Sequence, residues 1–192
     1  MALDLETTGL DRRRDAVVSL GLVPVREGRV HLADVRYTMV RPSVPPSPQS
    51  IVIHHLRPVD LQRAPGVEQA RHMLRMALED RFVLTWAGEI EAAFLGNLFD
   101  GRPRRWVRRS IDVLRLTLAY ERLSGSRVGR RPLSLSVAAR SFGVPVEEAH
   151  HALDDAIMTA EVFLVVATRL APFGFESVGS LLKASRLSSR IA

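Results

Sequence analysis

The 192-residue sequence contains no cysteine, which excludes disulfide bonds and thiolate-ligated metal sites. Lysine is nearly absent too, since Lys183 is the only lysine among 27 basic residues. No apolar run approaches the roughly 20 residues that a membrane-spanning helix needs. An acidic residue already occurs at Asp4, which argues against a signal peptide. These absences predict a cytoplasmic protein without a membrane segment.

Arginine supplies almost all of the positive charge, and the formal net charge is +6. Its planar, permanently charged donors suit phosphate groups. The charge balance favours a polyanionic partner, although an ordinary solvated surface gives the same composition. Hydrophobic residues make up 46% of the chain, which is long enough for one domain with a core.

The N-terminal part has the patterns of strands. Residues 1–5 and Ala16–Val25 are predicted strands, and a third is expected within Val30–Val40 after a turn at Glu27-Gly28. The four prolines of Pro42–Pro48 predict an extended loop.

Helical spacing dominates the rest of the chain, with a short strand at Phe82–Trp86 and a basic loop at Gly125–Arg131. Strands followed by alternating strands and helices predict an α/β fold, with a mixed central sheet flanked by helices. We assign residues 1–170 to one domain and residues 171–192 to a short basic helical tail. Helices are predicted at Val67–Leu78, Glu89–Phe99, Val113–Arg122, Leu133–Phe142, Ala152–Leu170 and Val178–Leu187.

The segment Asp4–Leu10 (DLETTGL) is the first that carries chemistry. Residues two apart on a strand point to the same side, so Asp4 and Glu6 project together. Adjacent carboxylates repel each other unless a cation lies between them, and oxygen ligands favour Mg²⁺ or Mn²⁺. A solvated acidic strand end shows the same D-x-E pattern, so this pattern alone does not establish a metal site.

The segment His150–Asp155 (HHALDD) lies where a long helix is predicted to begin. Residues four apart share a helix face, which would pair His150 with Asp154, or His151 with Asp155. His150 and Asp155 converge only if His150 precedes the helix, and a loop is predicted just upstream. For His151 and Asp154 we expect ordinary surface roles, since acids near a helix N-terminus also favour its dipole.

The segment Trp86–Leu95 (WAGEIEAAFL) joins a predicted strand to a predicted helix. Glu89 and Glu91 both lie in the first helical turn, where acidic residues are common. On their own, these two glutamates predict no function.

Taken together and in this order, the three segments resemble the DEDDh exonuclease family, which includes the epsilon proofreading subunit of bacterial DNA polymerase III, RNase T and oligoribonuclease. The resemblance runs over residues 2–166 and includes Ile53-His54 and Ser110–Leu114. It selects Asp155 over Asp154, because the family motif is H-x-A-x-x-D. The matched residues are Asp4, Glu6, Thr7, Thr8 and Gly9 for D-x-E-T-T-G, and His150, Ala152 and Asp155 for H-x-A-x-x-D.

The middle motif departs from the family pattern H-N-A-x-F-D, because Trp86–Glu91 reads WAGEIE. Aligning Phe94-Leu95 with the apolar pair that follows the motif places Glu91 at the position of the aspartate. Because the His-Asn pair is absent, the substrate contacts that it would make are in doubt. All four carboxylates are still present. Only three residues precede Asp4, so either the protein begins earlier or its first strand is truncated.

The resemblance implies a ribonuclease H-like fold, in which the first three strands are antiparallel and the later ones parallel. It also implies a 3′–5′ exonuclease that uses two divalent cations, Mg²⁺ or Mn²⁺. The implied roles are Asp4 bridging both ions, Glu6 and Asp155 on the first, Glu91 on the second, and His150 as general base.

The resemblance further implies that Thr7 and Thr8 donate to the terminal nucleotide. Leu10 is expected either to wedge against the last base or to be a core leucine, and His54 either to contact the nucleotide or to be structural. The expected substrate is the 3′ end of single-stranded or frayed DNA, with RNA ends as the alternative and a DNA polymerase as a candidate partner. A non-catalytic binding module with a decayed site is a third hypothesis, which only the altered middle motif supports.

Overall fold

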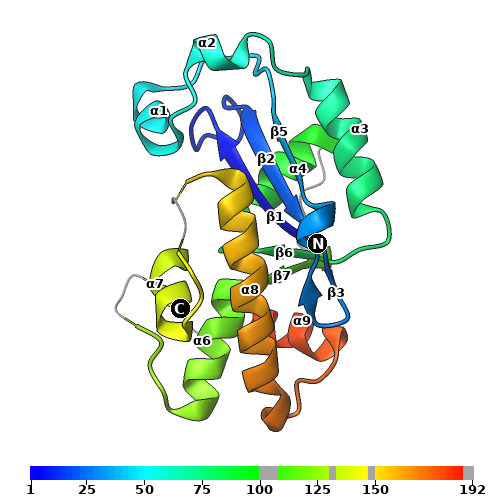
Figure 1. Cartoon of the computed structure of the whole chain (residues 1–192), viewed down its shortest axis with the longest axis vertical. Helices are drawn as coiled ribbons and strands as arrows, with labels where there is room; N and C mark the ends of the chain where they lie inside the picture. Colours follow the sequence, from blue (N-terminus) through cyan, green and yellow to red (C-terminus); the bar gives the residue numbers. More distant parts are fainter. Residues whose placement is uncertain (100–107, 130–132, 147–149, 188–192) are drawn as a thin grey trace.

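The computed structural model describes residues 1–99, 108–129, 133–146 and 150–187 of the chain. Within these residues, a five-stranded sheet has the strand order β5-β2-β1-β6-β7 (Figure 1). Strand β2 runs antiparallel to both β5 and β1, whereas β6 and β7 run parallel to β1, which confirms the predicted mixed sheet. The strands are β1 (Ala2–Thr7), β2 (Val17–Val23), β5 (Arg36–Met39), β6 (Val83–Thr85) and β7 (Ser110–Asp112).

The strand predicted over Ala16–Val25 is interrupted at Pro24, which has no N–H to donate to a ladder. Beyond it, β3 (Val25–Arg26) and β4 (Arg29–Val30) form a separate hairpin. Its turn is the predicted Glu27-Gly28, with φ angles of 51° and 70°. Positive φ at both central residues is what a two-residue hairpin of type I′ requires.

Most predicted helices agree with the structure. The bounds of α3, α4, α8 and α9 are those predicted, and α6 and α7 differ by two residues at one end. Residues 32–34 and 171–173 form short 3₁₀ turns. The α-helices are α1 (Pro48–His54), α2 (Pro58–Leu61), α3 (Val67–Leu78), α4 (Glu89–Phe99), α6 (Val113–Ser124), α7 (Leu135–Phe142), α8 (Ala152–Leu170) and α9 (Val178–Leu187).

The prediction of a loop over Pro42–Pro48 is wrong at its last residue, because Pro48 is the first residue of α1. Proline suits this position, where its missing N–H has no helical partner, and the Ser47 side chain caps the helix by accepting from the Ser50 amide at 3.1 Å. Helix α2 and strand β7 are too short to show a periodic pattern. In the predicted basic loop, Arg130 and Arg131 lie outside the described residues.

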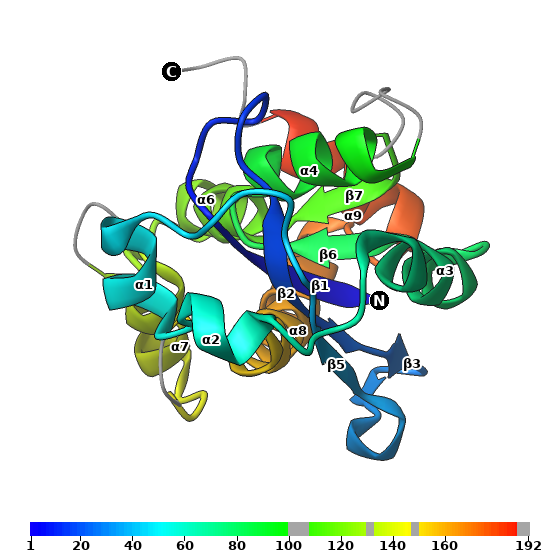
Figure 2. The same ribbon diagram turned by 90° about the horizontal axis from the view of Figure 1, so that it is seen from above.

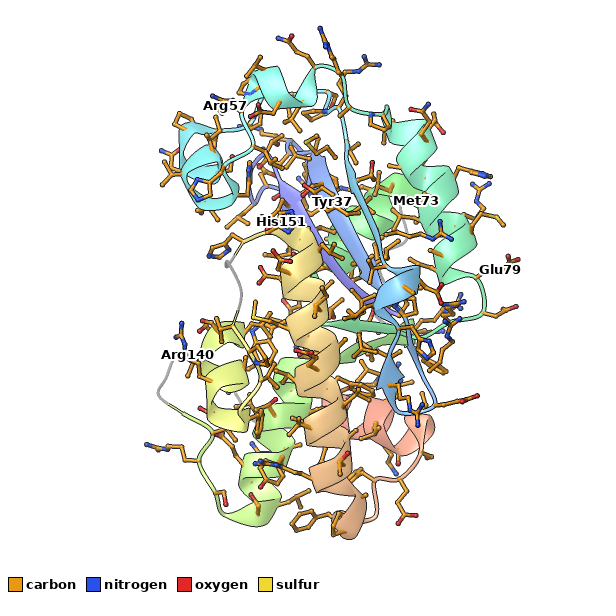
Figure 3. All side chains as sticks on the ribbon, in the orientation of Figure 1. Tyr37, Arg57, Met73, Glu79, Arg140 and His151 are labelled. Atoms are coloured by element: carbon orange, nitrogen blue, oxygen red, sulfur yellow. The ribbon has the colours of Figure 1, made fainter. Side chains whose placement is uncertain are left out.

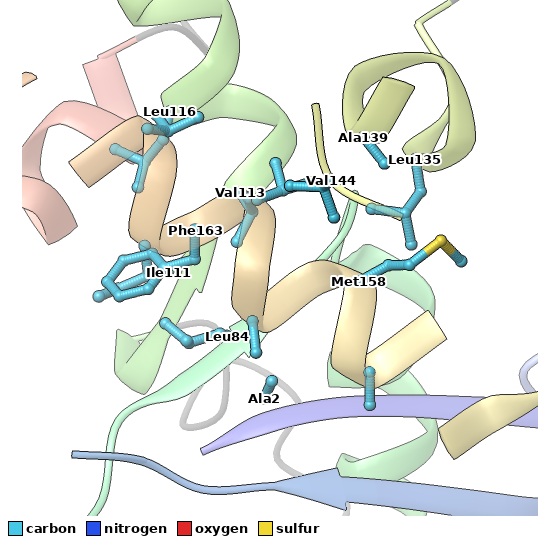
Figure 4. Packing of buried hydrophobic residues seen from close by; sticks show 14 of the residues in the cluster. Ala2, Leu84, Ile111, Val113, Leu116, Leu135, Ala139, Val144, Met158 and Phe163 are labelled. Atoms are coloured by element: carbon cyan, nitrogen blue, oxygen red, sulfur yellow. The ribbon is translucent and has the colours of Figure 1, made fainter. Parts of the chain in front are cut away.

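Helices cover both faces of the sheet (Figure 2). Helix α8 crosses one face and packs against β1 and β2, with α6 and α7 beside it. The close view in Figure 4 shows Ala2, Leu84 and Ile111 of the sheet beneath Met158 and Phe163 of α8. Helices α3 and α4 pack on the opposite face in a second cluster that contains Leu3 and Leu5. The alternation along β1 therefore directs Asp4 and Glu6 to one face, as predicted, and this is the face that α8 covers.

Helix α8 is long and apolar enough to cross a membrane by length and composition alone, which the sequence reading overlooks. In the structure its apolar residues belong to the core, including Ala156, Met158, Val162 and Val166. Helix α9 adds Leu181 and Ala184 to the same cluster. Residues 188–192 of the predicted tail lie outside the described residues, and the predicted division at residue 170 stays a prediction.

Candidate active site

Three segments that are distant in sequence meet at the C-terminal end of β1. Ligand atoms of Glu6, His150 and Asp155 all lie within 4.8 Å of one another. Asp4 belongs to the same group, because burial and then repulsion by Glu91, Asp155 and Glu6 raise its pKa well above the ordinary value. The structure thus brings Glu6, Asp155 and His150 together, with Asp4 and Glu91 near enough for their charges to interact with one another and with the cluster.

Burial is the largest cause of the raised pKa values at this site. It raises the pKa of Glu6 to about 8, with added repulsion by Asp155 and Glu91. It raises the pKa of Glu91 to about 7, with repulsion by Asp112 opposed by a backbone hydrogen bond. The pKa of Asp155 is raised for the same reason, although the His150 amide favours its charged form. Carboxylates packed this closely need a cation to remain ionised together.

The donor set fits divalent cations of the magnesium kind. Glu91 Oε2 is buried and has no hydrogen-bond partner within the described part of the chain. A buried carboxylate oxygen without a partner is costly, and an ion would supply the missing contact. Four carboxylates and one imidazole are mainly hard oxygen donors, which suit Mg²⁺ or Mn²⁺.

His150 precedes α8 instead of lying within it. The helix begins at Ala152, and His151 is its N-cap residue. His150 has a left-handed backbone with φ of 68°, and its amide donates to Asp155 Oδ2 at 3.0 Å. The geometric condition for His150 and Asp155 to converge is therefore met. The His150 side chain is exposed, so water and substrate can reach it.

The two threonines of the first motif shape the loop after β1. Thr8 is fully buried, and its hydroxyl donates to Asp15 Oδ1 at 2.8 Å while accepting from the Ala16 amide at 3.0 Å. The Thr7 hydroxyl donates to the Gly9 carbonyl at 2.7 Å. Both hydroxyl protons are already used, so this geometry does not support the predicted donation to a nucleotide.

Asp15 is a residue of this loop that sequence reasoning missed. Its carboxylate accepts hydrogen bonds from the Thr8 hydroxyl and from the Asp11 amide, each at 2.8 Å. It packs so closely on Gly9 that a Cβ there would lie 2.5 Å from Asp15 Oδ2. A larger residue at Gly9 would therefore displace the Asp15 carboxylate from this contact. No local sequence pattern indicates the role of Asp15.

Leu10 and His54 differ in exposure. Leu10 is 74% exposed, so the hypothesis of a core leucine is wrong and the wedge stays a prediction. His54 is buried on α1, and its Nδ1 accepts from the Leu56 amide at 3.0 Å. Burial lowers the pKa of His54, as does the nearby charge of His150. His54 therefore lies beside the site with a structural contact of its own, and its contact with a nucleotide stays a prediction.

The altered middle motif still delivers one glutamate to the cluster. Glu91 is 8% exposed and repels Asp4, whereas the Glu89 side chain is 80% exposed and pairs with Arg115 at 3.0 Å. Trp86 packs against the apolar residues between α6 and α7. Ala87 has a φ of 54°, a conformation that asparagine tolerates better than alanine. The family's asparagine at this position therefore has a backbone reason as well.

Asp112 is a second acid that sequence reasoning left without a role. It ends β7 and caps α6, accepting from the Arg115 amide at 3.0 Å. Its charge adds to the raised pKa of Glu91, which places it beside that residue. An acid at the end of a strand would have indicated a candidate site residue, but β7 has only three residues and shows no recognisable strand pattern.

His151 is more than the plain surface residue that the sequence predicts. Its ring stacks on Tyr37 of β5 with the ring centroids 4.7 Å apart. Figure 3 shows the two labelled residues close together near the beginning of α8. Its Nδ1 lies 3.0 Å from Asp154 Oδ2. Tyr37 lies on the face of the sheet that carries Asp4, since both are register partners of Gly21, and Asp154 lies in the first turn of α8.

A mixed sheet with this strand order, covered by helices on both faces and carrying clustered acids on its central strand, has the ribonuclease H-like fold. The profile of the RNase T family, described as exonuclease, matches residues 1–163. The chain therefore belongs to this exonuclease family.

Similar proteins include a DNA polymerase III of the PolC type from Thermotoga maritima, 26% identical over 95% of this chain and 13% of that protein. The 3′-5′ exonuclease DinG of Staphylococcus aureus is 21% identical over 96% of this chain and 20% of that protein. The chain thus spans at most a fifth of these two relatives. A crystal structure of E. coli exonuclease I with a dT13 oligonucleotide shares the fold, with a TM-score of 0.76 and 15% identity over 90% of this chain and 42% of that one.

Proposed function

We propose that this chain is a metal-dependent 3′–5′ exonuclease that acts on 3′ ends of single-stranded or frayed DNA. The observation that carries the proposal is the convergence of the four carboxylates Asp4, Glu6, Glu91 and Asp155 beside His150. Family membership supports exonuclease activity, and similarity to a 3′-5′ exonuclease supports the direction. The oligonucleotide in the similar crystal structure supports DNA as the substrate.

The four carboxylates would hold two divalent cations, which neutralise charge at phosphorus and lower the pKa of bound water. His150 accepts the proton of the attacking water, a role that a neutral imidazole can play as general base. The water oxygen bonds to phosphorus while the bond from phosphorus to the preceding 3′ oxygen breaks. That oxygen takes a proton from solvent, which leaves a shortened strand with a 3′ hydroxyl and a free 5′ mononucleotide.

A basic loop beside the site supports a polyanionic substrate. Arg12, Arg13 and Arg14 follow the first motif and are all exposed. The loop has a defined shape, because Asp15 binds Thr8 at its base and the Asn97 side chain donates to the Arg12 carbonyl. Exposed arginines on the loop that follows the carboxylate-bearing strand β1 suit the backbone of a bound strand. Similarity to a polymerase III also makes proofreading beside a polymerase part of the proposal.

The test uses 3′-labelled DNA and RNA strands of the same sequence, each with Mg²⁺ or Mn²⁺. We expect labelled mononucleotides from DNA at a higher rate than from RNA, and no release by the Asp4→Ala variant. Faster release from RNA would contradict the substrate assignment alone. Binding without release in either metal would contradict the enzyme and favour the non-catalytic module.

A further inference from the structure

The residue that follows the proposed general base makes contacts that the reaction does not use. The rings of His151 and Tyr37 stack with centroids 4.7 Å apart and an interplanar angle of 29° (Figure 3). Tyr37 belongs to β5, the edge strand of the sheet, so the stack joins the beginning of α8 to that edge. Asp154 adds a polar contact, 3.0 Å from His151 Nδ1.

The conformation of His150 needs such support. A non-glycine residue with a φ of 68° is energetically unfavourable and persists where its surroundings fix it. The bond from its amide to Asp155 fixes one side. His151 follows directly, with an extended backbone of φ −113° and ψ 114°. Holding His151 against Tyr37 therefore restrains the backbone from which the His150 side chain projects, and a ring nitrogen of His150 lies within 4.8 Å of carboxylate oxygens of Glu6 and Asp155.

The strand beneath the stack fixes the beginning of the helix as well. Gly21 of β2 is the register partner of Tyr37. A Cβ at Gly21 would lie 2.2 Å from the Ala152 carbonyl, so the first residue of α8 rests directly on the strand backbone. The backbone contact at Gly21 and the ring contact at Tyr37 together fix the distance of the first turn of α8 from the sheet and its orientation about the helix axis.

We propose that Tyr37 and His151 are positioning residues that hold the His150 imidazole in place for removing a proton from the attacking water. This inference rests on the proposed function, because it assigns a purpose to the geometry of its general base. Neither residue is a member of the cluster of Glu6, His150 and Asp155. The stack also lies at the rim of the fold, whereas α8 is anchored in the core by residues such as Met158.

The first test is kinetic, with 3′-labelled single-stranded DNA and Mg²⁺. Tyr37→Ala and His151→Ala each remove the stack, and we expect kcat to fall about 10- to 100-fold, the cost of a misplaced catalytic group, with KM nearly unchanged. Tyr37→Phe and His151→Phe keep two stacked rings and should keep most of kcat. The double variant Tyr37→Ala/His151→Ala should lose no more than either single variant, because both remove one contact.

A matched control is the chain's other tyrosine, Tyr120, whose ring contacts Phe142 between α6 and α7. Tyr120→Leu removes an aromatic contact away from the site and should leave kcat unchanged. A kcat loss in Tyr120→Leu that equals the loss in Tyr37→Ala would overturn the inference, since any lost ring contact would then suffice. Thermal unfolding of each variant confirms that the kinetic comparison is made on folded protein.

The second test needs neither metal nor turnover. In chelator, the proton NMR signals of the six histidines are assigned by substitution, that of His150 with His150→Gln. Tyr37→Ala should shift the His151 signal by removing the ring above it, and it should also move or broaden the His150 signal. Tyr37→Phe should change neither signal appreciably. An unchanged His150 signal together with full kcat in Tyr37→Ala overturns the positioning role. An inactive wild-type protein overturns the proposed function and leaves the NMR result to decide the geometry.

Discussion

His150 and Asp155, five residues apart in sequence, are joined by a hydrogen bond of 3.0 Å from the His150 amide to Asp155 Oδ2. On a continuous helix, residues five apart lie about 140° from each other around the axis. The contact exists because α8 begins only at Ala152 and His150 has a left-handed backbone. Asp155 thus shapes the segment that carries the proposed base, in addition to its proposed role as a metal ligand.

Glu91 is the most informative site residue to change, because it stands where the family has aspartate. Glu91→Gln keeps the size of the side chain and removes its charge. We expect kcat to fall at least about 100-fold, which is the upper end of the losses caused by changing a residue that supports a metal ligand. Glu91→Asp should retain more activity than Glu91→Gln. The measurement is nucleotide release at saturating Mg²⁺.

Glu89 provides the control within the same helical turn. Its side chain is 80% exposed and its pair with Arg115 is a surface contact, which contributes little. Glu89→Gln should therefore leave kcat unchanged. A greater loss in Glu89→Gln than in Glu91→Gln would show that the wrong glutamate has been assigned to the cluster.

The metal-free protein should lose stability as the pH rises. The pKa of Glu6 is raised from 4.5 to about 8, and that of Glu91 from 4.5 to about 7. Between these values the folded state binds more protons than the unfolded chain, so the free energy of unfolding falls with increasing pH. Thermal unfolding in chelator from pH 5 to pH 8 measures this decline.

Mg²⁺ should oppose that decline. Cations bind the deprotonated carboxylates, so Mg²⁺ should raise the unfolding temperature more at pH 8 than at pH 5. In Glu6→Gln, which lacks one of the carboxyl groups with a raised pKa, stability in chelator should depend less on pH. An equal effect of Mg²⁺ at both pH values would show that these carboxylates do not form the cation site.

Ala87 should be a position where substitution stabilises the protein. Its φ of 54° is unfavourable for alanine and easier for glycine or asparagine. We expect Ala87→Gly and Ala87→Asn to raise the free energy of unfolding by about 0.5–1 kcal/mol in urea denaturation. Ala119→Gly, inside α6, is the contrasting control and should lower it by about 1 kcal/mol. A loss of stability in both glycine variants would contradict the backbone explanation of the family's asparagine.

Arginines 12 and 13 should act on binding and leave chemistry unchanged. Arg12→Ala/Arg13→Ala should raise KM for single-stranded DNA while kcat stays close to that of the wild type. The dependence of log KM on log salt concentration should become less steep by about 0.7 per lost phosphate contact. Arg29→Ala, on the β3–β4 hairpin, should change neither value. Equal effects of both changes would indicate a general charge effect and no specific role for the loop.

Much of the site followed from short-range order in the sequence. The alternation of β1 alone predicted that Asp4 and Glu6 share a face, and in the structure Leu3 and Leu5 enter the core on the opposite face. The long helices were recognised because each buries one apolar face against the sheet. The resemblance was needed to choose Asp155 over Asp154, since helical spacing alone favoured other pairs.

The remaining features depend on contacts that no local pattern encodes. Asp15 acts through Thr8 within an irregular loop, and Tyr37 acts through His151, which is far away in sequence. Asp112 was missed because β7 has only three residues. The threonines of the first motif were assigned to substrate, but burial and the nearby Asp15 engage Thr8 within the protein.

The central claim is that Asp4, Glu6, Glu91 and Asp155 together hold two divalent cations, and a titration with Mn²⁺ tests it most directly. Bound Mn²⁺ is counted by electron paramagnetic resonance as the ion is added to metal-free protein. We predict two ions per wild-type chain and fewer in Asp4→Asn, with His150→Gln still binding two. One ion or none in the wild-type protein, or two ions in Asp4→Asn, would contradict the account.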